Sequence, residues 1–327
     1  MQINNTNCEY IGFSTTLDNN TISGFHKINQ DCLEISKGIF GNLFIIGRGI
    51  GANCAEVVSR MTVKAIKNYF NKLSINYNIK YELENSIKLA ANEVNAYLSE
   101  HNKLNICGAS VAILLSSQNQ IYFANAGDCR IYLIRDNKIS LLSSEQPIES
   151  KCLASEHHLN INKTDTPDEY NIGNIIGKIY VEPNIFGPYT LYKNDYIILS
   201  TKGLYQRITR FELLKSLINS NNESINKIYI DKSLSKKILF RNTNNVNFDL
   251  FIQRMYNLAK TRLSSEDFSF FMLRILKAPS LPVNPKDLQK EKYKFIIYLL
   301  LFLISLSFFI YTVLPLFLSY SMTIFYK

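Results

Sequence analysis

The first candidate for chemistry is a glycine-rich turn between an apolar run and an amphipathic stretch. Gly47-Arg48-Gly49-Ile50-Gly51-Ala52 follows the apolar run Leu43–Ile46 and precedes a helical pattern, which is the local form of a dinucleotide-binding turn. Such a site also needs a strand that ends in Asp or Glu about twenty residues later, and that part of the chain still has a helical pattern. The strands that follow form a meander rather than a βαβ unit, so the sequence argues against a dinucleotide site.

Cysteine and histidine patterns point to no zinc site. The six cysteines include no C-x-x-C pair, and the four histidines have no zinc-type spacing with them. The first residues also lack the basic-then-apolar pattern of a secretory signal. We therefore expect free, mostly buried thiols in a reducing compartment. Cys129 has no histidine placed to act as its base, so we interpret it as a structural thiol.

The composition excludes several classes of protein. The chain has 327 residues, of which 46% are hydrophobic and 12% aromatic, and this excludes a disordered chain. The net charge of +9 comes without a stripe of Lys and Arg interleaved with stacking aromatic residues, so we expect no nucleic-acid partner.

The elements that must position any site are a mixture of strands and helices. Strands are predicted at Tyr10–Thr15, Leu43–Ile46, Val111–Leu115, Ile121–Ala126, Ile131–Ile134, Ile139–Leu142, Tyr196–Leu199 and Phe268–Ile275. Two long amphipathic helices are predicted around Ala55–Tyr69 and Leu83–Tyr97, and shorter ones at Phe211–Ile218 and Phe251–Leu258. Because the strands come in runs rather than alternating with helices, an α+β fold is favoured over a doubly wound parallel sheet.

Short polar motifs follow one another in order along these elements. They are His26-Lys27-Ile28-Asn29-Gln30-Asp31, the glycine-rich turn at 47–52 followed by Ala55-Glu56-Val57-Val58-Ser59, Ala91-Asn92, Gly108-Ala109-Ser110, Gly127-Asp128-Cys129-Arg130-Ile131-Tyr132, Leu142-Ser143-Ser144-Glu145-Gln146, Ser200-Thr201-Lys202-Gly203-Leu204 and Glu266-Asp267-Phe268-Ser269. This series resembles the metal-dependent protein serine/threonine phosphatases of the PPM (PP2C) family in their bacterial form. The resemblance covers most of residues 8–275. It implies an αββα sandwich of two antiparallel sheets flanked by helices, which agrees with the element order.

The resemblance also implies a site, and the chain departs from it at three motifs. The family holds two divalent ions with carboxylates, since Mg²⁺ and Mn²⁺ prefer hard oxygen ligands, and the ions activate a water that attacks a phosphoserine or phosphothreonine. The bridging Asp falls at Arg48, the Asp of the S-D-G motif at Lys202, and the phosphate-clamping Arg at His26. The acids retained are Asp31, Asp128, Glu266 and Asp267.

These departures lead to a prediction about where the two cations point. We expect Arg48 and Lys202 to contact Asp31, Asp128 or Glu266 and to form ion pairs in the former metal pocket, because inward acids with neither metal nor cations would repel one another. Two alternatives stay open. The cations could extend into solvent, or one metal could remain on Asp31, Asp128 and Glu266 or Asp267.

The C-terminal part predicts a membrane anchor. Residues 295–326 contain no charged residue, and a helix over residues 295–314 would span about 30 Å. Four lysines lie just before it (286, 290, 292 and 294) and only Lys327 beyond it, which favours a cytoplasmic N-terminal domain. The predicted organisation is a PP2C-like domain at 1–277, a linker rich in Pro and Lys at 278–294, and a transmembrane anchor at 295–327.

Taken together, the sequence predicts a membrane-anchored PP2C-like pseudophosphatase that binds or scaffolds a cytoplasmic protein, such as a phosphoprotein or a kinase. No cofactor is expected under this interpretation. The alternative is an active or weakly active metal-dependent phosphatase with an altered site, which would use Mn²⁺ or Mg²⁺.

Overall fold

The computed structural model describes most of the chain up to residue 278. The described residues are 8–16, 28–51, 54–74, 77–117, 120–143, 174–222, 234, 236–243, 245–262, 266–278 and the single positions 298, 300, 302, 305 and 307. The chain divides into two compact units, Met1–Pro279 and Ser280–Lys327.

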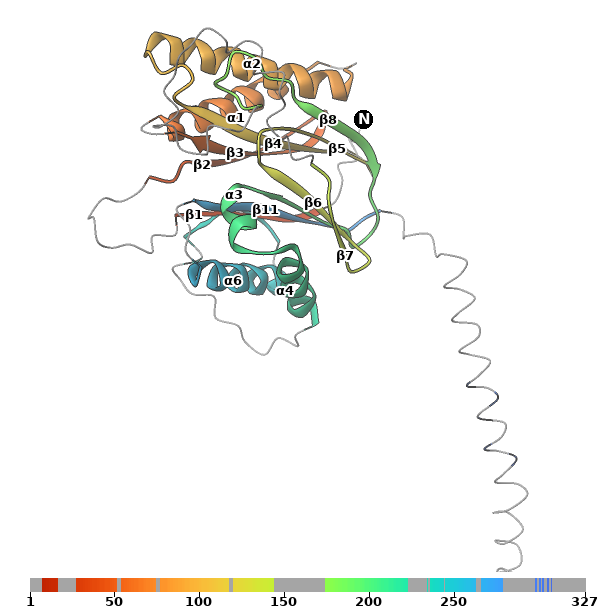
Figure 1. The fold of residues 1–327 in the computed structure, drawn as a ribbon. Coiled ribbons are helices and arrows are strands. Elements are labelled where there is room, and N and C mark those ends of the chain that lie inside the picture. Colours follow the sequence, from red (N-terminus) through yellow and green to blue (C-terminus); the bar gives the residue numbers. More distant parts are fainter. Residues whose placement is uncertain are drawn as a thin grey trace, which may run out of the picture. The chain divides into compact units, whose positions relative to one another are not determined.

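The first unit is built on two antiparallel sheets that face each other (Figure 1). The five-stranded sheet has the order β2 (Asp31–Gly38), β3 (Gly41–Ile50), β4 (Gly108–Ser117), β5 (Gln120–Ala126) and β8 (Asn184–Thr190). The six-stranded sheet has the order β10 (Ile238–Asn242), β1 (Cys8–Thr15), β11 (Phe268–Ile275), β9 (Tyr196–Ser200), β6 (Arg130–Arg135) and β7 (Lys138–Leu141). Alternating apolar side chains of both sheets, such as Phe44, Phe123 and Phe271, fill the space between them.

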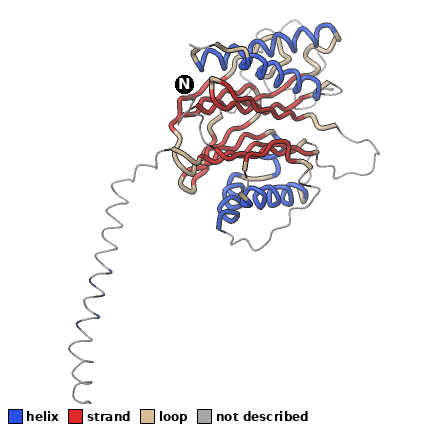
Figure 2. Tube along the Cα trace, turned by 180° about the vertical axis from the view of Figure 1, so that it is seen from behind, coloured by secondary structure: helices blue, strands red, loops and turns tan. Residues whose placement is uncertain are grey.

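Helices cover the outer face of each sheet (Figure 2). The pair α1 (Ala55–Asn71) and α2 (Ile79–Glu100) packs on the five-stranded sheet through one apolar cluster, and a second cluster joins α3 (Lys202–Arg207), α4 (Arg210–Asn222) and α6 (Val246–Lys260) to the six-stranded sheet. The arrangement confirms the predicted α+β sandwich of helices, two antiparallel sheets and helices.

All eight predicted strands are present, and β11 has the predicted bounds. Three strands were missed, namely β2, β8 and β10, and each lies at the edge of its sheet. Edge strands tolerate polar and exposed side chains, so the alternating pattern that identifies a half-buried strand is weak in them. Asp136 and Asn137 both have positive φ and join β6 to β7 in a hairpin.

The predicted linker and membrane anchor lie outside the described residues, except for residue 278 and the five single positions between 298 and 307. Those five positions are helical and exposed. Within the part of the chain that the structure describes, no helix is both long and apolar enough to span a membrane.

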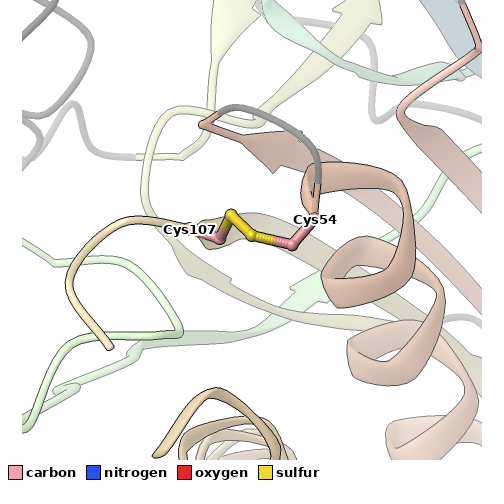
Figure 3. The surroundings of a disulfide bond; sticks show 2 residues. All are labelled: Cys54 and Cys107. Carbon is pink, nitrogen blue, oxygen red and sulfur yellow. A yellow bond between two sulfur atoms is a disulfide. The ribbon is translucent and has the colours of Figure 1, made fainter. Parts of the chain in front are cut away.

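The expectation of free thiols is wrong for two of the six cysteines. Cys54 and Cys107 form a disulfide, with their Cα atoms 6.0 Å apart (Figure 3). It joins the N-terminus of α1 to the residue before β4 and is buried. The spacing of 53 residues carries no recognisable motif, so only the folding of β3 and β4 side by side brings these sulfur atoms together. Cys8, Cys32 and Cys129 are free.

Candidate functional site

The polar residues singled out in the sequence converge where strands of the two sheets end. Asp31 is the first residue of β2 and lies directly opposite Arg48 in the β2–β3 ladder. Asp128 lies in the turn between β5 and β6, and Lys202 is the first residue of α3. Glu266 comes just before β11. Because these positions lie at the ends of different strands, the sandwich places side chains from five distant segments together.

Arg48 occupies the centre of this group. It is 2% exposed, and its guanidinium donates from Nε to Glu266 Oε2 at 2.9 Å and from Nη2 to Glu266 Oε1 at 2.9 Å. The third nitrogen, Nη1, donates to Asp128 Oδ2 at 3.2 Å. A bidentate arginine–carboxylate contact of this kind is among the stronger charge-assisted interactions in proteins. The guanidinium is therefore held in place by two acids from different segments.

Lys202 joins the same group from the start of α3. Its Nζ lies 3.6 Å from Glu266 Oε1, and its side chain is 20% exposed. We call Arg48, Lys202, Asp128 and Glu266 the ion-pair cluster. The predicted contacts of both cations with the acids are confirmed, and the alternative in which they extend into solvent is wrong.

Asp31 and Asp267 lie beside the ion-pair cluster and are buried. Asp31 Oδ2 accepts a hydrogen bond from Thr201 Oγ1 at 2.8 Å, and Asp267 Oδ2 accepts one from the backbone N–H of Gln30 at 2.7 Å. Burial raises the pKa of Asp31 to about 7, and the charge of Asp267 adds to this rise, while hydrogen bonds from Ser269 and Thr201 and the charge of Arg48 oppose it. Near pH 7 both the protonated and the ionised form of this carboxyl group are therefore populated.

Three residues on or next to α3 were missed in the sequence. Thr201 supplies the hydrogen bond to Asp31, and Tyr205 donates from its hydroxyl to the backbone carbonyl of Asp128 at 3.0 Å. Arg207 is 2% exposed, and burial lowers the pKa of its guanidinium, while the charges of Glu266, Asp267 and Asp31 oppose this shift. A helix of six residues is too short to show a helical period. The sequence feature that could have pointed to them is the pair of cations, Lys202 and Arg207, directly after the apolar run that forms β9.

The remaining predicted residues have these positions. His26 lies outside the described residues. Cys129 is buried, and burial raises the pKa of its thiol far above the usual range, as expected for a structural thiol rather than a nucleophile. Arg130 places its guanidinium 3.6 Å from the ring centre of Tyr205, which is a cation–π contact that links the start of β6 to α3.

The donor set at this place does not fit a pair of divalent ions. A metal would need the oxygens that Arg48 already occupies on Asp128 and Glu266, and the guanidinium itself would lie among the ligands. Across the described residues, no three or more His, Cys, Asp and Glu side chains are arranged to hold a metal ion. We therefore derive no metal-dependent step for this chain.

Comparison with known proteins finds similarity to protein phosphatase 2C. The family model for protein phosphatase 2C matches residues 16–152. A protein phosphatase 2C-type protein of Streptococcus pyogenes serotype M6 is 26% identical over 199 residues, which cover 58% of this chain and 78% of that protein.

Solved structures share the fold. The serine/threonine phosphatase PstP of Mycobacterium tuberculosis has a TM-score of 0.58 at 15% identity, covering 83% of this chain and 99% of PstP. A serine/threonine phosphatase of Staphylococcus aureus has a TM-score of 0.60 at 19% identity, covering 85% of this chain and 98% of that one. PstP has also been solved in complex with two manganese ions. A segment of the chain thus matches the protein phosphatase 2C family model, its sequence is similar to a bacterial PP2C-type protein, and its sandwich fold is shared with bacterial serine/threonine phosphatases.

Proposed function

We propose that the chain is a pseudophosphatase, in which the PP2C fold has been kept and the paired metal centre has been replaced by ion pairs. The observation that carries this proposal is the position of Arg48. Its buried guanidinium bridges Asp128 and Glu266 at the place where the family resemblance expects the carboxylate that bridges two metals. A side chain that donates to both acids supports a role in neutralising them, because buried acids without counter-charges are costly.

A magnitude supports the same proposal. A single positive charge about 4 Å from a divalent ion is repelled by roughly 8 kcal/mol at an effective dielectric constant of 20. The carboxylate that the resemblance expects at this position would attract the ion by a similar amount. The change from Asp to Arg therefore removes an attraction and adds a repulsion, and Lys202, at the start of α3, repeats this change.

A second candidate function is a phosphatase with an altered, weakly bound metal. One observation favours it, since Asp128 Oδ1 is buried and accepts no hydrogen bond from the residues that the structure describes. A buried carboxylate oxygen of this kind could take part in binding a cation or a water molecule. The bacterial proteins of similar fold named above are described as serine/threonine phosphatases. A measurement of phosphatase activity therefore tests this alternative directly.

Manganese titration by calorimetry, with phosphopeptide turnover measured on the same sample, separates the two functions. The full chain in detergent is expected to show no two-site binding of Mn²⁺ and no turnover above the blank. Any Mn²⁺ binding or turnover that appears in the variant Arg48→Asp/Lys202→Asp measures how much of the lost metal binding and activity is due to these two positions. Tight binding at two sites with turnover in the unaltered chain would refute the pseudophosphatase proposal and establish the phosphatase.

For the partner, we propose a cytoplasmic phosphoprotein. Lys202 supports this choice, because its side chain is 20% exposed whereas that of Arg48 is 3% exposed, and an accessible cation is what a phosphate group needs. Fluorescence polarisation with matched phosphorylated and unphosphorylated peptides tests it. Lys202→Gln should weaken binding of the phosphorylated peptide alone, and equal loss for both peptides would contradict a phosphate contact.

For location, we propose that residues 295–314 anchor the chain in a membrane with the PP2C-like domain in the cytoplasm. The uncharged run at 295–326 and the lysines before it support this topology. The Cys54–Cys107 disulfide weighs against it, because cytoplasmic thiols are usually kept reduced. Alkylation of cysteines in intact and lysed cells, followed by mass measurement, tests both points. A domain that is labelled by a membrane-impermeant reagent in intact cells would overturn the proposed orientation.

A further inference from the structure

The Cys54–Cys107 disulfide lies at the same end of the sandwich as the ion-pair cluster. Arg48 and Ser110 are opposite each other in the β3–β4 ladder, each two residues from the end of its strand. Cys107 directly precedes β4, and Cys54 is the N-cap residue of α1, the helix that follows β3. The disulfide therefore links the chain segments next to the strand ends that carry Arg48 and Ser110.

Ser110 connects the start of β4 to the acid that pairs with Arg48. Its Oγ accepts hydrogen bonds from the backbone N–H groups of Asp128 at 2.7 Å and Cys129 at 2.8 Å, and it donates to the carbonyl oxygen of Ala126 at 3.2 Å. One side chain thus holds the turn between β5 and β6. Because Asp128 Oδ2 accepts a hydrogen bond from Arg48, the position of β4 sets the distance between the two members of this ion pair.

The helix on the other side of the disulfide is connected to the site as well. A Cβ atom at Gly49 would collide with the carbonyl oxygen of Ala55, so the end of β3 packs directly on the first turn of α1. One turn further, Ser59 donates to the carbonyl oxygen of Gln30 at 2.6 Å, and the N–H of Gln30 donates to Asp267 Oδ2 at 2.7 Å. A movement of the start of α1 is therefore transmitted to Asp267 through two hydrogen bonds.

We propose that Cys54 and Cys107 form a redox-sensitive latch on the candidate site. The disulfide fixes the start of α1 against the start of β4 and keeps Arg48 aligned with Asp128, whereas reduction releases both segments and loosens the ion-pair cluster. The redox state thus sets how rigidly the site presents its charges, whatever the site binds. The inference draws on the proposed cytoplasmic location, because the disulfides that do occur in the cytosol are usually transient or redox-sensing.

The reaction needs a dithiol, or two molecules of a monothiol such as glutathione. A thiolate of the reductant attacks one sulfur atom of the Cys54–Cys107 bond and forms a mixed disulfide, and a second thiolate displaces the protein sulfur. Two electrons pass to the protein, the two protons of the reductant end on Cys54 and Cys107, and the reductant becomes a disulfide. The two cysteines are 2% and 1% exposed, so the attack requires a local opening of this end of the domain.

Hydrogen exchange measured by mass spectrometry tests the latch on the full chain in detergent, before and after reduction with dithiothreitol. Reduction should accelerate exchange of the Asp128 and Cys129 amides by about tenfold or more, because the segment that carries Ser110 is released. The Tyr192 amide is the matched control and should change by less than about twofold. It also donates to a side-chain oxygen, Asp195 Oδ2 at 2.8 Å, but in a half-buried turn before β9, whereas the site lies beyond the other end of that strand.

Glutathione buffers with an increasing share of the reduced form show whether the bond is switchable. Alkylation of trapped thiols, followed by mass measurement, should find the disulfide opening along this series and forming again when the series is reversed. A disulfide that survives the most reducing buffer would be a permanent structural bond and would overturn the proposal.

Two outcomes of the exchange experiment would also overturn it. Unchanged exchange at Asp128 would show that the site does not respond to reduction, and equal acceleration at Tyr192 would show a general loss of stability instead of a release of the site. The variant Cys54→Ser/Cys107→Ser should exchange as the reduced chain does, with and without dithiothreitol, and the reduced unaltered chain gives the same comparison if this variant does not fold. Two-site Mn²⁺ binding with turnover would refute the pseudophosphatase proposal and would leave the latch intact.

Discussion

Replacing Arg48 by methionine tests the energetic role of the ion-pair cluster most directly. The substitution keeps an unbranched side chain of similar length and removes the donors to Glu266 and Asp128. These two acids are only 12% and 16% exposed, so solvent cannot replace the lost partner. Breaking a buried ion pair by removing one member costs about 3–5 kcal/mol. We expect the free energy of unfolding to fall by this amount near neutral pH.

Urea unfolding followed by circular dichroism measures this loss, and two further variants make the result specific. Arg60→Met is the matched control, because Arg60 pairs with Glu56 on the surface of α1 with its side chain 64% exposed, and such pairs contribute less than about 1 kcal/mol. Adding Glu266→Gln to Arg48→Met should recover part of the loss, because it removes the stranded charge. A cost below about 1 kcal/mol for Arg48→Met, or no recovery in the double variant, would refute the reasoning that Arg48 neutralises the acids.

Three further predictions concern the elements around the site. Reduction of the Cys54–Cys107 disulfide should lower the free energy of unfolding by about 4 kcal/mol, as the chain-entropy estimate gives for its loop of 53 residues, and a reductant should have no effect on a variant with both cysteines replaced by serine. Thr201→Val should cost about 1–3 kcal/mol in urea unfolding, because the buried carboxyl of Asp31 loses a hydrogen bond; an unchanged stability would contradict that bond. The pKa of Glu212 is lowered to about 2 by its hydrogen bonds with Arg262 and Thr209, so its stabilising contribution is present above about pH 4.5 and is lost as the pH falls toward 2. Glu212→Gln should therefore lower the midpoint of thermal unfolding at pH 7 more than at pH 3, and equal shifts would show that the charge is not involved.

The sequence alone predicted much of the fold because apolar residues follow the period of the element that they form. Central strands such as β4 and β11 are apolar on both faces, since each packs between a second sheet and a helical layer, and they were identified from this run of apolar residues. The missed strands β2, β8 and β10 have mixed burial at sheet edges. These segments form strands because a neighbouring strand pairs with them, and the local sequence pattern carries no information about that neighbour.

The sequence also indicated which side chains could meet at the candidate site. The charged residues of its motifs lie at the ends of predicted strands, and the order of the motifs matches that of the resembling family. Only the tertiary structure decided how those charges combine. It places the Arg48 guanidinium between Glu266 and Asp128, which come from distant segments of the chain. The physical reason is that the energy of a buried charge depends on its distance to other charges and to water, and these distances are set by the packing of the two sheets against each other rather than by spacing along the chain.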